Sequence, residues 1–145
     1  MIKIICVGKI KEKYLNELIN DYKTRISKYH KIEIIELKDS NITSESDEIL
    51  KVLKNSDYNI LLDINSNMLN SIELSKLITD TFNNSYGTIS FIIGGSNGVD
   101  NRVKSIVDYK LSFSKLTFPH GLFRGILLEQ IYRSFKIINN ESYHK

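Results

Sequence analysis

The feature that most constrains the fold is the alternation of short apolar runs, rich in β-branched residues, with longer segments of helical periodicity. The apolar runs are predicted to be strands, at residues 1–8, 32–37, 58–64, 88–93 and 109–113. The other segments are predicted to be helices, at residues 11–29, 44–54, 69–82, 99–107 and 119–138. Strands and helices that alternate in this way form a mostly parallel sheet with helices on both faces. The predicted class is therefore α/β, with a five-stranded, mostly parallel sheet.

The length of the chain bounds the number of domains. Its 145 residues are enough for one ordinary domain, and the single proline and the absence of a Gly/Ser-rich stretch leave no candidate linker. Hydrophobic residues make up 41% and charged residues 26%, which is typical of a globular protein rather than a disordered one. We therefore expect one domain that spans residues 1–145.

The charge is small overall but unevenly distributed. The net charge is +3, and residues 101–145 hold 8 of the 20 basic residues but only 3 of the 17 acidic ones. This excess favours an anionic partner, including nucleic acid, although a basic helix face that meets only solvent is an equal alternative.

Several classes of protein are not expected. One cysteine excludes an internal disulfide, and the three histidines lack ligand spacing with it, so we predict no metal site. Cys6 itself is expected to be a small buried core residue. No apolar stretch reaches the roughly 18 residues of a membrane span, so we expect no membrane contact and a cytoplasmic location.

The terminal helix carries apolar residues on more than one side. We expect a second subunit to cover that breadth, and burial by the rest of its own domain is the alternative. The positions concerned are Leu122, Phe123, Ile126, Leu127, Leu128, Ile131, Tyr132, Phe135, Ile137 and Ile138.

Three loops are expected to lie together. In open parallel sheets, ligands bind beyond the carboxyl ends of the strands, which places the loops after Asp63, Ile93 and Phe113 at one edge. The glycine-rich loop at residues 94–98 could approach an anion closely, and residues 111–121 offer hydroxyls and apolar side chains for a flat heterocycle. Taken alone, each loop is equally consistent with an ordinary turn or with a loop packed by its own side chains.

The last residues, Tyr143, His144 and Lys145, place an aromatic ring, an imidazole and a cation together. Histidine suits proton transfer near neutral pH, although the end of a chain is by default solvated.

These motifs, taken together and in order, resemble one family over essentially the whole chain. It is the small, single-domain SPOUT methyltransferase family that modifies a pseudouridine of large-subunit (23S) ribosomal RNA at N3. The motifs are IKIICVGKIKEKY (residues 2–14), FIIGGSNG (91–98), LSFSKLTFPH (111–120), LLEQIYRSFKI (127–137) and SYHK (142–145). The chain departs from the family in a shorter region at residues 38–54 and in lacking an acidic–glycine pair before the second helix.

The resemblance implies a C-terminal trefoil knot, a homodimer, and methylation of 23S rRNA within the assembled ribosome by S-adenosylmethionine (SAM) without a metal. By position, the residues implied to bind SAM are Leu62, Gly94, Phe113, Ser114, Lys115, Leu116, Thr117 and Phe118. We expect His144 to take the proton of the target nitrogen, with Tyr143 holding it and Arg133 stabilising negative charge on the base or its phosphates. The residues expected to contact RNA are Arg124, Arg133 and Lys145, with Lys104, Lys110, Lys115 and Lys136 as further candidates.

Two other readings stay open at this point. A nucleotide-binding protein could use the glycine-rich loop for phosphate, although the lysine of a P-loop is missing, and it would bind ATP or NAD but not SAM. A non-catalytic RNA-binding module of the same fold would bind RNA without transferring methyl groups.

Overall fold

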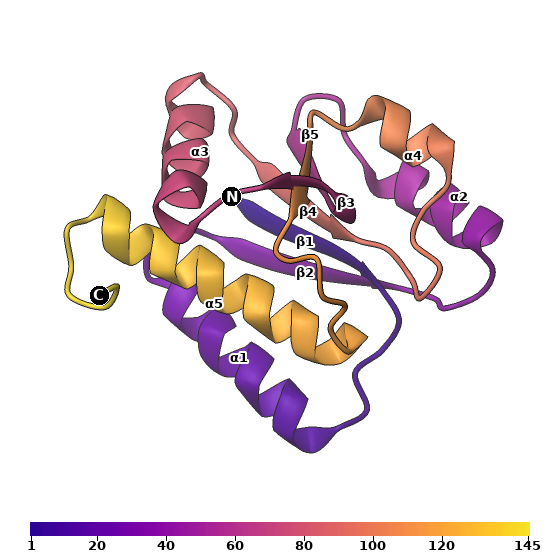
Figure 1. The fold of residues 1–145 in the computed structure, drawn as a ribbon, viewed down its shortest axis with the longest axis horizontal. Coiled ribbons are helices and arrows are strands. Elements are labelled where there is room, and N and C mark those ends of the chain that lie inside the picture. The colour runs from indigo at the N-terminus through magenta and orange to yellow at the C-terminus, as the bar shows by residue number, and fades with distance from the viewer.

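The computed structural model describes residues 1–145 as one α/β domain of five strands and five helices (Figure 1). The strands are β1 (Ile2–Val7), β2 (Ile32–Leu37), β3 (Tyr58–Met68), β4 (Ile89–Ile93) and β5 (Tyr109–Ser112). The helices are α1 (Lys13–Ser27), α2 (Ile42–Val52), α3 (Ser71–Asn83), α4 (Asn101–Ile106) and α5 (His120–Ile138). All neighbouring strands pair in parallel, in the order β2-β1-β4-β3-β5. The predicted class is confirmed. The trefoil knot is compatible with this strand order and stays a prediction.

Helices cover both faces of the sheet because its central strands are apolar on both sides. In β1, Ile4 packs into a cluster with side chains of α1, α3 and α5, whereas Ile5 packs on the opposite face with side chains of α2 and α4. Helix α5 lies between α1 and α3 and contacts both (Figure 1). Every residue of β1 and β4 is buried, which is the pattern of strands covered twice.

Local capping decides where two of the helices begin. The side chain of Asn41 accepts a hydrogen bond from the Ser44 amide (2.9 Å), so α2 begins at Ile42 rather than at Ser44 as predicted. Helix α3 begins at Ser71 behind a capping box, in which Asn70 and Glu73 each accept from the other's backbone amide.

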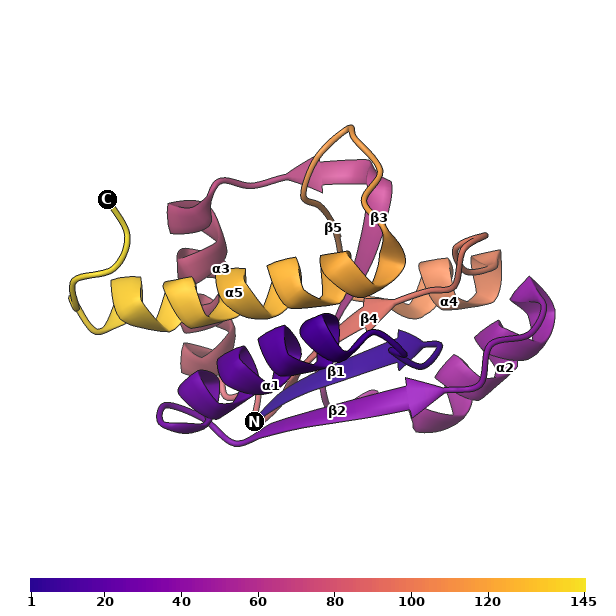
Figure 2. The same cartoon turned by 90° about the horizontal axis from the view of Figure 1, so that it is seen from below.

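Strand β3 is longer than its apolar run. It was expected to end at residue 64, but it continues to Met68 because, after an irregularity that follows Leu62, Asn67 and Met68 pair with Leu111 and Ser112 of β5. The polar residues of this extension are compatible with a strand because it lies outside the core. Figure 2 shows the extension standing clear of α5, together with the segment that joins β5 to α5.

Cys6 is fully buried, as expected from its place in an apolar run. Burial raises the pKa of its thiol to about 11, although nearby Arg124 acts in the opposite direction. The thiol therefore stays protonated at neutral pH and behaves as a small apolar side chain. No helix of the chain combines the length and the apolar character needed to cross a membrane.

Candidate active site

The three loops predicted to lie together do converge, because parallel strands end at one edge of the sheet. They enclose a cavity of about 170 Å³. Of the residues predicted to bind a cofactor, seven line it, namely Leu62, Gly94, Phe113, Ser114, Leu116, Thr117 and Phe118. Lys115 does not; it is exposed and faces a neighbouring hollow beside Ile64 and Met68.

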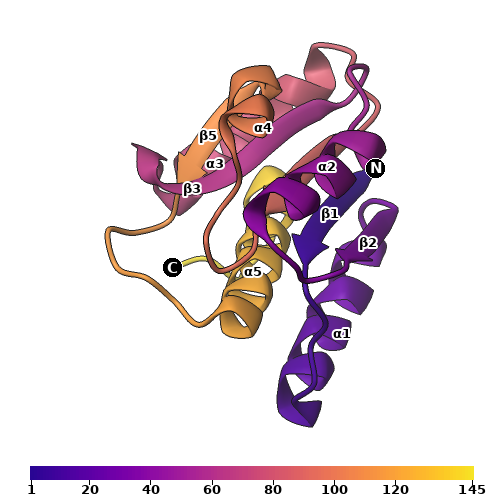
Figure 3. The ribbon, with the colours of Figure 1, turned by 90° about the vertical axis from the view of Figure 1, so that its right-hand side faces the viewer.

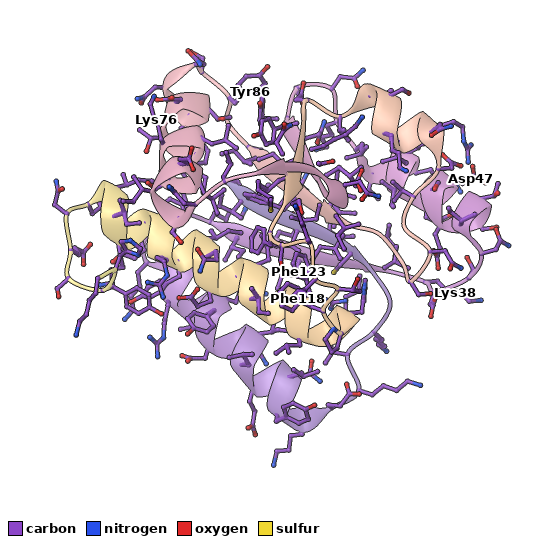
Figure 4. All side chains as sticks on the ribbon, in the orientation of Figure 1. Lys38, Asp47, Lys76, Tyr86, Phe118 and Phe123 are labelled. Atoms are coloured by element: carbon purple, nitrogen blue, oxygen red, sulfur yellow. The ribbon has the colours of Figure 1, made fainter.

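Aromatic side chains form one wall of this cavity. Phe123 of α5 packs edge-on against Phe113 (ring centres 5.2 Å apart) and stacks on Phe118 (6.0 Å, planes 19° apart) (Figure 4). From the sequence, Phe123 was predicted only as an apolar residue of the last helix. Its position one turn after Pro119, close to the predicted ligand loop, was the one indication that it could line the cavity. The segment that carries Phe113 and Phe118 reaches outward before it returns to α5 (Figure 3). Two hydrogen bonds within this segment fix its shape, from Ser112 Oγ to the Ser114 carbonyl and from the Leu116 amide to Ser114 Oγ (both 3.0 Å).

The glycine-rich loop is tightly packed at its first two residues, which explains why Gly94 and Gly95 have no side chains. A Cβ on Gly94 would lie 2.8 Å from Val99 Cγ1 and 3.0 Å from the backbone of Gly98. A Cβ on Gly95 would overlap the carboxyl group of Glu45. Gly98 has φ +77°, and its amide donates to the Gly95 carbonyl (2.9 Å). The backbone of this loop can therefore approach a ligand closely, and an added methyl group would displace it.

A second, larger cavity of about 950 Å³ adjoins the first, and the two share Gly95 and His120. It lies between the β1–α1 connection, the end of β2 and the start of α5, and no ligand site was predicted there from the sequence. Its charged lining residues are Lys9, Lys11, Glu12, Glu36, Lys38 and Asp39.

Arg124 lies beneath this second cavity, not on the surface. Its side chain is 2% exposed; Nη1 donates to Glu36 Oε2 (2.6 Å) and Nη2 donates to the Gly8 carbonyl (3.1 Å). The prediction that Arg124 contacts RNA phosphates is therefore wrong for this structure. A guanidinium held by a carboxylate and a carbonyl fixes the start of α5 against the ends of β1 and β2.

Glu45 is a buried carboxyl group at the boundary of the glycine-rich loop. Its Oε2 accepts from the Ser40 amide (2.8 Å), and burial raises its pKa; the nearby Asp39 carboxyl raises it further, and His120 lowers it. Two acidic side chains of the region at residues 38–54, Asp39 and Glu45, therefore lie beside the predicted ligand loop.

The tail residues form a cluster with α5. The hydroxyl of Tyr143 donates to Glu129 (2.9 Å), Arg133 donates to the same carboxylate (2.6 Å), and the guanidinium lies 4.8 Å from the Tyr143 ring centre. Arg133 Nη1 lies 3.2 Å from His144 Nδ1. Burial and the hydrogen bonds to Tyr22 and Glu129 raise the pKa of Tyr143, so this phenol is a neutral donor. The structure thus brings together Arg133, Tyr143 and His144, whereas Lys145 is exposed without an ion pair.

This tail cluster lies at the wrong end of α5 to act on the cavity of its own chain. The tail turns back after α5 (Figure 1) and contacts Glu129 and Arg133, and Arg133 lies about 20 Å along the helix from His120, which is beside the cavity. Within one chain, the predicted cofactor loops and the predicted catalytic tail are separated.

Most of the apolar breadth of α5 is covered within a single chain. Leu127, Leu128, Ile131, Tyr132 and Phe135 are buried between α1 and α3. Burial by the rest of its own domain therefore accounts for the apolar breadth of α5. That breadth is no argument for a second subunit. Exposed apolar residues remain around the cavities instead, at Tyr14, Leu116 and Leu122.

Comparisons with known proteins agree with this arrangement. The family model described as "Predicted SPOUT methyltransferase" matches residues 1–144. The chain is 50% identical to "Ribosomal RNA large subunit methyltransferase H" of Fusobacterium nucleatum and 49% identical to the putative enzyme of that name in Methanococcus maripaludis, with 99% of both chains covered in each case. In fold, it is similar to a probable methylase family protein of Haemophilus influenzae (TM-score 0.59, 12% identity, 99% of this chain and 70% of that one). It is also similar to the TrmH/SpoU tRNA modifying enzyme of A. aeolicus (TM-score 0.52, 13% identity, 95% and 77%). Sequence and fold agree that the chain belongs to the SPOUT methyltransferase family.

Proposed function

We propose that this protein transfers a methyl group from SAM to N3 of a pseudouridine in 23S rRNA of the assembled ribosome. The observation that carries the proposal is the convergence of the three loops, predicted from separate motifs, on one cavity. Its full-length relatives are named large-subunit ribosomal RNA methyltransferases, which supports the RNA substrate.

The residues present fit the proposed methyl donor. Apolar and aromatic side chains, including Leu116, Phe118 and Phe123, suit a planar adenine, and the tightly packed backbone at Gly94 suits close approach. A cavity of about 170 Å³ is smaller than a typical small-molecule pocket of about 300–1,000 Å³, so it holds only part of the donor. The larger cavity, which adjoins it at Gly95 and His120, would hold the rest. When bound, SAM supplies an electrophilic methyl group, and the protein supplies position and electrostatics.

The active site is proposed to be shared between the two chains of a homodimer. Arg133, which contacts His144, lies 13 residues after His120 in α5 and so about 20 Å from it along the helix, which is too far for the tail to act in its own chain's cavity; the tail of a partner would reach the bound donor instead. The exposed apolar side chains of Tyr14, Leu116 and Leu122 beside the cavities supply a surface for such contact.

In this arrangement, the tail contributes hydrogen-bond donors. The guanidinium of Arg133 can only donate, so Nδ1 of His144 accepts and the proton of the neutral ring is on Nε2. His144 was expected to be the base, but the lone pair that a base requires is engaged here. His144 Nε2–H and Arg133 instead suit the carbonyl oxygens of the target base, where negative charge develops. The proposed phosphate contacts are Arg133, which pairs with Glu129, and four lysines that form no ion pair, namely Lys104, Lys110, Lys115 and Lys145.

Two measurements test the proposed function. Calorimetry with SAM, ATP and NAD should show binding of SAM alone. Radiolabelled SAM should then label 23S rRNA in ribosomes from cells that lack the enzyme, and ribosomes with uridine in place of the pseudouridine should stay unlabelled. Binding of ribosomes without methyl transfer would instead identify a non-catalytic module, and labelling of neither RNA would contradict the proposal.

Replacing Gly94 by alanine should weaken SAM binding at least about 100-fold, because the added methyl group forces the loop away from Val99 and from the Gly98 backbone. Calorimetry measures the change. The matched control is Gly87→Ala, since a Cβ at Gly87 meets no atom within 4 Å and this glycine has no positive φ. Equal SAM affinity in the two variants would place the donor elsewhere.

A further inference from the structure

His120 occupies the junction of the two cavities and has a defined protonation pattern. It is the first residue of α5, it lines both cavities, and its Nε2 lies 2.7 Å from the carbonyl oxygen of Val7. A carbonyl oxygen only accepts, so Nε2 carries a proton. In the neutral ring, Nδ1 then holds a lone pair, and no protein group donates to it. The structure therefore fixes the tautomer and leaves one basic nitrogen free at the junction.

The charged groups around His120 can stabilise a proton taken up at Nδ1. The nearby carboxyl groups are Glu45, which interacts electrostatically with His120, and Asp39, which lies beside Glu45 and lines the same cavity. Arg124 lies one turn further along α5, but Glu36 neutralises it at 2.6 Å. The positive end of α5 and the lysines that line the larger cavity, Lys9, Lys11 and Lys38, oppose a charge on the ring, whereas the two carboxyl groups favour it.

We propose that His120 is the catalytic base, acting on the same chain whose loops hold the methyl donor; this rests on the proposed function. In the step, the N3–H bond of the target base breaks and its proton goes to Nδ1 of His120. The electron pair of N3 forms the bond to the methyl carbon, and the electrons of the carbon–sulphur bond remain on sulphur as a neutral thioether. The positive charge of the donor thus ends on the imidazole, beside Glu45 and Asp39. The tail of the partner donates to the carbonyl oxygens and takes no proton.

The variant His120→Gln distinguishes a role of His120 as catalytic base from a purely structural role. The glutamine amide can still donate to the Val7 carbonyl in place of Nε2, but it has no basic nitrogen. Single-turnover methyl transfer to ribosomes should fall about 10²–10⁴-fold, the usual contribution of a general base, whereas SAM affinity by calorimetry should change less than threefold. The control is His30→Gln, because His30 stacks on Phe82 away from both cavities, and it should retain the full rate.

A readout without turnover is the ¹⁵N spectrum of the histidines at neutral pH. It should show His120 protonated at Nε2 and unprotonated at Nδ1, and the opposite tautomer would overturn the proposal. Full activity of His120→Gln would also overturn it. If His120→Gln no longer binds SAM or no longer folds, His120→Ala is assayed with added imidazole instead. Recovery of methyl transfer would support His120 as the base, and no recovery would overturn the proposal. Failure of the proposed function is distinguishable, because the unmodified protein would then label no 23S rRNA.

Discussion

Deletion of residues 142–145 is expected to reduce methyl transfer at least about 10³-fold while leaving SAM affinity within about threefold. The deletion removes Tyr143 and His144, and it leaves Arg133 with Glu129 as its only side-chain partner. The cofactor cavity lies at the other end of α5, so its loops keep their packing. Single-turnover transfer to ribosomes measures the first effect, and calorimetry measures the second.

Mixed dimers test whether the site is shared. A tail-deleted subunit keeps its cavity, and a Gly94→Ala subunit keeps its tail, so neither homodimer should be active. In an equal mixture, half of the dimers are mixed, and each holds one complete site if the tail acts on the partner. Activity should therefore recover to about a quarter of that of the unmodified protein. If the tail acted on its own chain, no mixed dimer would hold a complete site, and a mixture without activity would contradict the shared arrangement.

Replacing Arg124 by alanine is expected to lower the free energy of unfolding by about 1.5–3 kcal/mol, the usual contribution of a hydrogen bond to a charged group, because Arg124 is buried whereas its partner Glu36 is 37% exposed. The change leaves Glu36 and the Gly8 carbonyl without their donor and opens a cavity where a 2%-exposed side chain had been. Urea unfolding followed by circular dichroism measures the difference.

The matched control for this variant is Arg102→Ala. Arg102 also pairs with carboxylates, Asp47 and Asp100, but its side chain is 49% exposed, so its removal should cost less than about 1 kcal/mol. If Arg124→Ala were as stable as this control and bound ribosomes with a weaker salt dependence, Arg124 would be a phosphate contact, as its sequence position first suggested.

The pattern of apolar runs was sufficient to predict the five strands and five helices because each run must be buried, and its length and period leave few ways to do so. Boundaries were less well predicted. The start of α2 depends on the side chain of Asn41, and the extension of β3 depends on pairing with β5, a contact between segments more than 40 residues apart. Periodicity within one segment contains no information about such a partner.

The candidate site, too, has one part that was predicted from the sequence and another part that was not. The sequence by itself determined that Leu62, Gly94 and the segment at residues 113–118 would meet, because strands that run in parallel must end together at one edge of the sheet. Only the tertiary structure decided that Arg124 is buried, that His120 faces both cavities and that the tail is remote from them. These outcomes depend on how α5 packs between α1 and α3, and that packing is set by side chains distant in sequence, which no local pattern records.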